Sequence, residues 1–106
     1  MSLWFVCRSE GWQHYDSEGW GACLRFVEVG DDQLARRQIE VYDSGEILVY
    51  ERKHARDRFG QLMGLRFSKK DKWRDHFEEV ESLSEQEFER AWKLYSPLAL
   101  EDVGAV

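Results

Sequence analysis

No stretch of this sequence is hydrophobic over the roughly 18 consecutive residues that a membrane-spanning helix requires. The first seven residues, Met1–Cys7, also lack the basic start and the long apolar run of a secretory signal peptide. We therefore expect a cytoplasmic protein that makes no contact with a membrane.

Cysteine and histidine are too few and too scattered to indicate a metal site. Cys7 and Cys23 have no C-x-x-C spacing, and the three histidines form neither an H-x-x-x-H nor an H-E-x-x-H motif. In a reducing compartment we expect two buried thiols rather than a disulfide. We predict neither a metal nor a cofactor.

Catalytic motifs are missing as well. The sequence has no G-x-S-x-G elbow and no glycine-rich phosphate loop. Cys7 lies in an apolar run, whereas a reactive thiolate needs an accessible and electropositive setting. We expect that the protein is not an enzyme.

The size and composition fit one globular domain over residues 1–106. A chain of 106 residues buries roughly 60–70% of its unfolded surface, and five tryptophans provide large core anchors. The predicted fold class is α+β: an antiparallel sheet of four to five strands with a C-terminal helix packed on one face, and a second short helix before it as an open alternative. Residues 1–67 should form mostly sheet and loops, residues 68–95 should be helical, and residues 96–106 should form a tail.

The strand signals lie in the first half of the chain. Residues 3–7 are continuously apolar, which is typical of a central strand, and residues 23–29 alternate well enough for a second strand. Residues 37–42 and 46–50 form a hairpin closed by Asp43-Ser44-Gly45. Residues 64–68 are a candidate for one more strand, and residues 51–63 read as a mobile polar loop.

The first strand of this hairpin has a period of two. Ile39 and Val41 lie on one face, and Gln38 and Glu40 lie on the other. This alternation is the pattern of a half-buried strand, so we expect the glutamine and the glutamate to face water.

The helix signals lie near the C-terminus. Ser84 and Glu87 have the spacing of a capping box, and an apolar stripe follows at helical spacing: Phe88, Ala91, Trp92 and Tyr95. Glu89 and Lys93 are spaced for an ion pair on the solvent side, and Ser96-Pro97 should end the helix. A shorter helix from Ser68 would have Asp71 as its capping partner and would bury Trp73, Phe77 and Val80 as its apolar stripe.

Two segments carry a resemblance to a known family: Arg37–Gly45, which reads R-Q-I-E-V-Y-D-S-G, and Leu83–Trp92, which reads L-S-E-Q-E-F-E-R-A-W. They resemble a family of uncharacterised small bacterial α+β domains. Both patterns form secondary structure, so the resemblance implies the fold and a bacterial origin but no catalytic residue. The segment 52–74 departs from the family, in which a shorter and more acidic connection would be expected.

The net charge of −6 hides a strong internal pattern. Residues 52–74 carry nine basic and two acidic side chains, whereas residues 75–106 carry two basic and nine acidic ones. An acidic whole disfavours non-specific attraction to nucleic acid. The basic segment either faces acidic residues within the fold or meets phosphates or an acidic protein surface, and both readings stay open.

Two candidate binding surfaces follow from this pattern. A protein partner would meet acidic residues and exposed aromatic residues: Glu78, Glu79, Glu81, Trp12, Tyr15 and Trp20. Nucleic acid would instead meet basic residues: Arg56, Arg58, Lys69, Lys70, Lys72 and Arg74. We expect an immunity-type or inhibitor protein that blocks a cognate effector or toxin, with a nucleic-acid-binding module as the alternative. The oligomeric state is left open.

Overall fold

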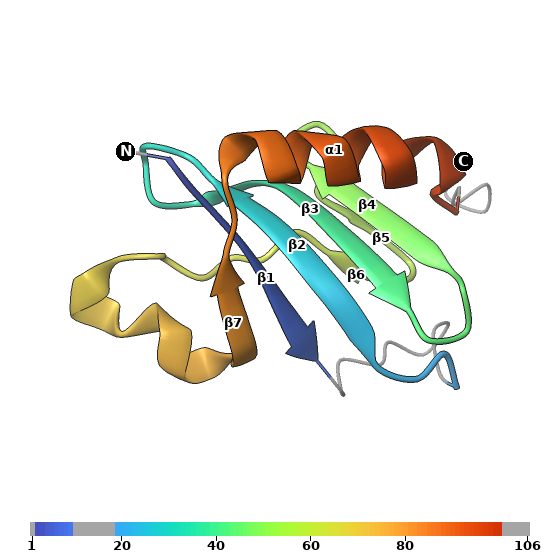
Figure 1. Ribbon diagram of the computed structural model, residues 1–106, viewed down its shortest axis with the longest axis horizontal. Helices are drawn as coiled ribbons and strands as arrows, with labels where there is room; N and C mark the ends of the chain where they lie inside the picture. Colours follow the sequence, from blue (N-terminus) through green and yellow to red (C-terminus); the bar gives the residue numbers. More distant parts are fainter. Residues whose placement is uncertain (1, 10–18, 101–106) are drawn as a thin grey trace.

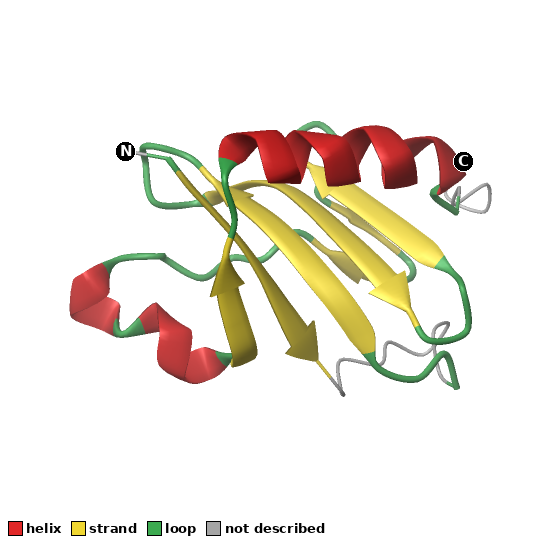
Figure 2. Ribbon diagram, viewed as in Figure 1, coloured by secondary structure: helices red, strands yellow, loops and turns green. Residues whose placement is uncertain are grey.

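The computed structural model describes residues 2–9 and 19–100, and it has the predicted α+β fold. Five antiparallel strands form a sheet in the order β4-β3-β2-β1-β7, and helix α1 crosses one face of it (Figures 1 and 2). The strands of this sheet are β1 (Leu3–Ser9), β2 (Cys23–Val29), β3 (Ala35–Tyr42), β4 (Ile47–Glu51) and β7 (Glu78–Ser82). The other elements are β5 (Arg56–Asp57), β6 (Gly60–Gln61), α1 (Glu85–Tyr95) and 3-10 turns at Lys69–Asp71, Trp73–His76 and Ser96–Leu98.

The predicted capping box starts helix α1. The Ser84 hydroxyl accepts a hydrogen bond from the Glu87 amide at 3.1 Å, and the Glu87 carboxylate accepts one from the Ser84 amide at 2.9 Å. The hydrogen bond from the Ser84 amide to the carboxylate lowers the pKa of Glu87. The helix ends at Tyr95, directly before Ser96-Pro97, as predicted.

The apolar stripe of α1 packs on the sheet. Phe88 and Ala91 are buried against Ile39 and Ile47, which confirms the predicted helix face. At the border of this cluster lie half-buried side chains: Trp4, Phe26, Val41, Val49, Trp92, Tyr95 and Ala99.

The hairpin between β3 and β4 is confirmed. Tyr42 and Glu46 close it, since the Tyr42 amide donates to the Glu46 carbonyl at 3.0 Å. Gly45 has a φ of 103°, a left-handed conformation that glycine adopts without the steric cost that a side chain would bring.

The second face of the sheet is covered by residues 52–77, and so the expectation of a mobile polar loop over residues 51–63 is wrong. Phe59 is buried against Tyr42, Leu48 and Tyr50. The Asp57 carboxylate accepts hydrogen bonds from the Tyr50 hydroxyl at 2.8 Å and from the Phe59 amide at 2.9 Å. These bonds hold the loop onto the sheet.

The expected helix from Ser68 is also wrong. The segment forms two 3-10 turns and then strand β7, because Lys72 takes a left-handed φ of 48° and Phe77 is extended. Trp73 and Phe77 still pack on the core, where the ring centroid of Trp73 lies 4.7 Å from that of Phe5. Only residues 85–95 of the predicted helical region 68–95 are α-helical.

One further expectation is wrong, and it concerns the candidate strand over residues 64–68. Residues 64–68 form no strand; Phe67 is buried, and its amide donates to the Gln33 carbonyl at 2.8 Å. The start of the predicted tail is fixed, since the Leu100 amide donates to the Ile47 carbonyl at 2.8 Å.

The polar face of β3 is buried rather than half-exposed. Gln38 is 1% exposed and Glu40 is 4% exposed, because the segment 52–77 folds back over them. The side chains of this strand alternate between the two faces of the sheet as predicted, but both faces of the strand are covered. The structure must therefore satisfy two polar side chains in its interior.

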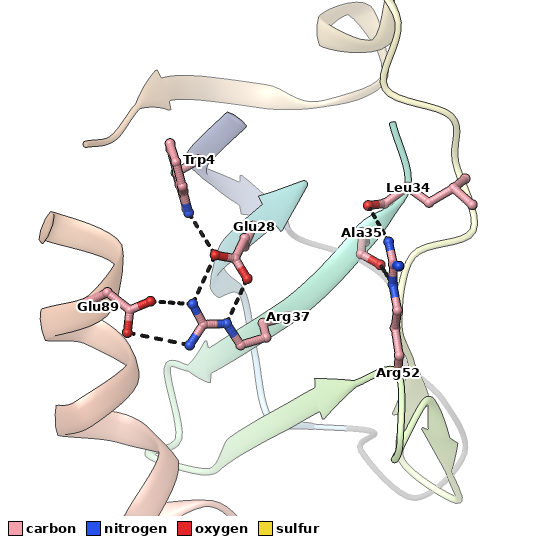
Figure 3. A network of polar contacts seen from close by, with 7 residues as sticks. All are labelled: Trp4, Glu28, Leu34, Ala35, Arg37, Arg52 and Glu89. Atoms are coloured by element: carbon pink, nitrogen blue, oxygen red, sulfur yellow. Dashed lines mark hydrogen bonds and ion pairs between the residues drawn. The ribbon is translucent and has the colours of Figure 1, made fainter. Parts of the chain in front are cut away.

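On the opposite face, Arg37 connects the sheet to α1 (Figure 3). Its guanidinium donates to both carboxylate oxygens of Glu28, at 2.7 and 2.9 Å, and also to Glu89 on the helix. The Trp4 indole donates to Glu28 at 3.0 Å. The helical spacing predicted an ion pair between Glu89 and Lys93. In the structure Glu89 pairs with Arg37 instead. Burial opposes the charge of Glu28, but the hydrogen bonds from Arg37 and Trp4 leave its pKa below the ordinary value.

We predict that Arg37→Met destabilises the fold by about 3 kcal/mol, since it leaves Glu28, which is 5% exposed, as a buried charge whose remaining hydrogen-bond donor among the described residues is Trp4. Chemical denaturation measures the difference. Arg66→Met is the matched control, because Arg66 is exposed and forms no ion pair within the described residues, and its effect should stay within about 0.5 kcal/mol. Equal denaturation midpoints for the two variants would contradict this role of Arg37.

The same ion pair predicts a pH dependence. A carboxyl whose folded pKa lies below its unfolded value of about 4.3 stabilises the fold above that value, and the contribution is lost as the pH falls through the folded pKa. The difference between wild type and Arg37→Met should therefore shrink below about pH 4. A difference that is constant from pH 7 to acid conditions, measured by denaturation at each pH, would count against the pair.

Candidate functional site

Three predicted partner-binding carboxylates lie on the edge strand β7: Glu78, Glu79 and Glu81, named here the acidic edge. All three side chains are exposed. Strand β7 has only β1 as a neighbour in the sheet. In the register Arg8 lies opposite Glu78 and Val6 lies opposite Glu81, so these two glutamates share the sheet face that carries α1.

The six predicted nucleic-acid-binding residues do not gather on one surface. All are exposed, but Arg56 and Arg58 lie at the β5–β6 hairpin, which packs on β4 through Tyr50. The others lie at the 3-10 turns beside β7, at the opposite edge of the sheet (Figure 1): Lys69, Lys70, Lys72 and Arg74. Among the described residues no ion pair connects the basic segment 52–74 to residues 75–100.

The aromatic side chains near the basic residues are packed in the core. Phe59, Phe67 and Trp73 are buried. Trp20, a predicted contact residue, is half-buried, and its ring centroid lies 5.2 Å from Tyr42 and 5.4 Å from Phe59. The other two predicted aromatic contacts, Trp12 and Tyr15, lie outside the described residues.

A cavity that no motif in the sequence indicates lies on the second face of the sheet. Its volume is about 430 Å³, and it lies between strands β2 and β3 and the covering segment. Polar side chains of the two strands line it: Arg25, Gln38, Glu40 and Tyr42. The covering segment adds mainly apolar groups: Phe59, Met63, Leu65 and Phe77.

Glu40 is the centre of the polar group. Its carboxylate accepts hydrogen bonds from the Gln38 amide and from the Tyr42 hydroxyl, both at 2.6 Å. Nε of Arg25 lies 3.3 Å from the same carboxylate but forms no hydrogen bond within the described residues. The proximity is therefore an electrostatic contact that leaves the Nε–H donor of Arg25 unsatisfied.

Gln38 ties this group to the covering segment. Its side-chain oxygen accepts a hydrogen bond from the Met63 amide at 2.9 Å, and its side-chain nitrogen donates to the Gln61 carbonyl at 3.1 Å. A single glutamine thus holds the backbone on one side of the cavity.

Burial and charge shift the ionisation of the neighbouring groups. Burial opposes the charge of Arg25, but Glu40 and the nearby thiols leave its pKa above the ordinary value. Burial, together with Glu40, raises the pKa of Tyr42. Burial raises the pKa of Cys7 to about 11 and also raises that of Cys23. Both cysteines are buried free thiols, as predicted, and neither has the setting of a nucleophile.

A signal for this polar group was present in the sequence. Arg25 lies directly opposite Glu40 in the β2–β3 register, and Cys7 lies opposite Arg25 on β1. Pairing the strands would have placed the two charges on one face. The burial of that face, however, depends on a distant segment.

Over residues 2–9 and 19–100, no three His, Cys, Asp or Glu side chains come together as possible metal ligands. Within the same ranges, no helix is long and apolar enough to cross a membrane. Comparisons of the chain with protein-family models, with curated proteins and with solved structures find no match.

We predict that the charge of Arg25 is needed only while Glu40 is charged. Arg25→Met should destabilise the fold by about 3 kcal/mol, because it leaves a carboxylate that is 4% exposed without its cation. The double variant Arg25→Met/Glu40→Gln should recover most of that loss, since no buried charge remains. Denaturation of the four proteins in the cycle measures the coupling. Strictly additive effects would contradict the pairing.

Proposed function

We propose that this chain is a protein-binding domain of the immunity or inhibitor type, which blocks a cognate effector or toxin through the acidic edge. The observation that carries the proposal is the lack of partners for these carboxylates. Within the described residues, Glu78, Glu79 and Glu81 form no ion pair and no side-chain hydrogen bond. The buried glutamates, by contrast, are each matched with an arginine.

Two features of the acidic edge disfavour pairing with another strand. A bulge interrupts the register between β1 and β7 opposite Cys7, and Glu79 has a left-handed φ of 50°. Bulges and closely spaced charges on an edge strand both disfavour the addition of a further strand. A partner would therefore be recognised through the carboxylates and not through the backbone.

The backbone that carries the carboxylates is well anchored. Val80 packs against the core, the Leu83 amide donates to the Trp4 carbonyl at 2.9 Å, and the Arg74 guanidinium donates to the Ser82 hydroxyl at 2.9 Å. An anchored backbone needs no reordering when a partner binds, and this lowers the entropic cost of association.

The chemistry of the edge fits a basic protein surface. Carboxylates that face water attract lysine and arginine over roughly a Debye length of 8 Å at physiological salt, which speeds association. Nucleic acid fits the geometry less well, since the basic residues are divided between the two edges of the sheet and the adjacent aromatic rings are buried.

The proposal is tested with a partner captured from a lysate of the source organism and then purified. The variant Glu78→Lys/Glu81→Lys should bind it about tenfold more weakly or worse, with an unchanged melting temperature, and wild-type affinity should fall as salt is added. Binding that is unchanged by the reversal would leave the edge an ordinary solvated surface.

Glu46→Lys/Glu85→Lys is the matched control. Both residues are glutamates outside β7, of which Glu85 is exposed and Glu46 is half-buried, and reversing them removes the same amount of negative charge. The proposal requires this control to bind nearly as wild type does. An equal loss in both double variants would indicate that only the net charge matters.

A further inference from the structure

The cavity on the second face of the sheet is a separate feature from the acidic edge, and the proposed function does not use it. Its volume of about 430 Å³ lies within the range of roughly 300–1,000 Å³ that is common for small-molecule sites. It combines apolar walls with a few polar groups that converge on one side, which is the usual composition of such sites.

The polar side chains that line the cavity differ in how many hydrogen bonds they already form. Glu40 already accepts from Gln38 and Tyr42 and is charge-paired with Arg25. The Arg25 side chain is only 6% exposed, and its Nε, which is enclosed beside Glu40, has no hydrogen-bond partner within the described residues. Buried donors are rarely left in this state. Because Nε is enclosed, an acceptor on a ligand in the cavity would have to meet the terminal guanidinium nitrogens of Arg25.

The charge of the site defines the kind of acceptor. Arg25 and Glu40 compensate each other, so an anionic group placed beside the guanidinium would also lie close to the Glu40 carboxylate. A carbonyl oxygen or a ring nitrogen accepts a hydrogen bond without that repulsion. The other charged or titratable groups that line the cavity are Tyr42 and His76, and His76 is exposed at its rim.

The walls define the rest of the ligand. Phe59 and Phe77 line the cavity, and aromatic walls favour flat aromatic rings, which stack on them or pack against their edges. We propose that this cavity binds an uncharged aromatic or heteroaromatic molecule, whose carbonyl or ring-nitrogen acceptor receives a hydrogen bond from Arg25.

Gly64 provides a way to block the site without disturbing the core. It lines the cavity and is exposed, and a Cβ placed on it would meet no atom within 4 Å. A large side chain at this position should therefore narrow the cavity mouth and leave the fold intact. Arg66, two residues further on, is exposed and does not line the cavity, so Arg66→Trp is the matched control for Gly64→Trp.

The experiment titrates the full chain with benzamide, nicotinamide and benzoate and follows amide chemical shifts by NMR. Benzamide or nicotinamide should shift the Met63 amide and the Gln38 side chain saturably, and benzoate should bind at least about tenfold more weakly. Gly64→Trp should weaken amide binding at least about fivefold, and Arg66→Trp should leave it unchanged.

A variant of the polar side gives an independent readout. Arg25→Met/Glu40→Gln, which removes both charges together, should stay folded and lose amide binding. No saturable shift with either neutral probe, benzoate binding as tightly as benzamide, or equal effects of Gly64→Trp and Arg66→Trp would each overturn the proposal.

Discussion

The burial of polar side chains on strand β3 is the constraint on which the rest of this structure depends. Gln38 and Glu40 lie under the segment 52–77, and each must find partners there, since a buried polar group without them costs about 1–3 kcal/mol. Gln38 forms hydrogen bonds with the backbone of the covering segment. Glu40 accepts hydrogen bonds from Gln38 and Tyr42 and forms an ion pair with Arg25. The same constraint leaves a polar cavity in the layer between the sheet and its cover.

The buried charges on the two faces of the sheet are stabilised in different ways. On the helix face, Arg37 satisfies Glu28 with two short hydrogen bonds and stacks beside Phe88 and Trp92, with its Cζ 5.0 and 4.9 Å from their ring centroids. On the cavity face, Arg25 neutralises Glu40 but keeps an unused donor. The first pair is complete and holds α1 to the sheet. The second lines the cavity for which we propose a ligand.

The sequence was most informative where local chemistry decides structure. The capping box at Ser84 and the Asp43-Ser44-Gly45 turn each depend on a few neighbouring residues, and both elements were predicted correctly. Strand β7 was missed because its sequence, E-E-V-E-S, has little strand propensity and becomes a strand by pairing with β1 more than 70 positions away in the chain. The cavity was missed for the same reason, since the burial of Gln38 depends on a segment that begins well beyond it.

The most direct test of this account is native-state hydrogen exchange at the Met63 amide, which donates to the Gln38 side chain. The account predicts protection in the wild type and exchange that is about fivefold faster or more in Gln38→Met, since a buried hydrogen bond is worth about 1 kcal/mol. The Leu100 amide, bonded to Ile47 at 2.8 Å, should keep its rate in the variant. A Met63 amide that exchanges freely in the wild type, or at the same rate in both proteins, would show that Gln38 does not hold the cover on the sheet.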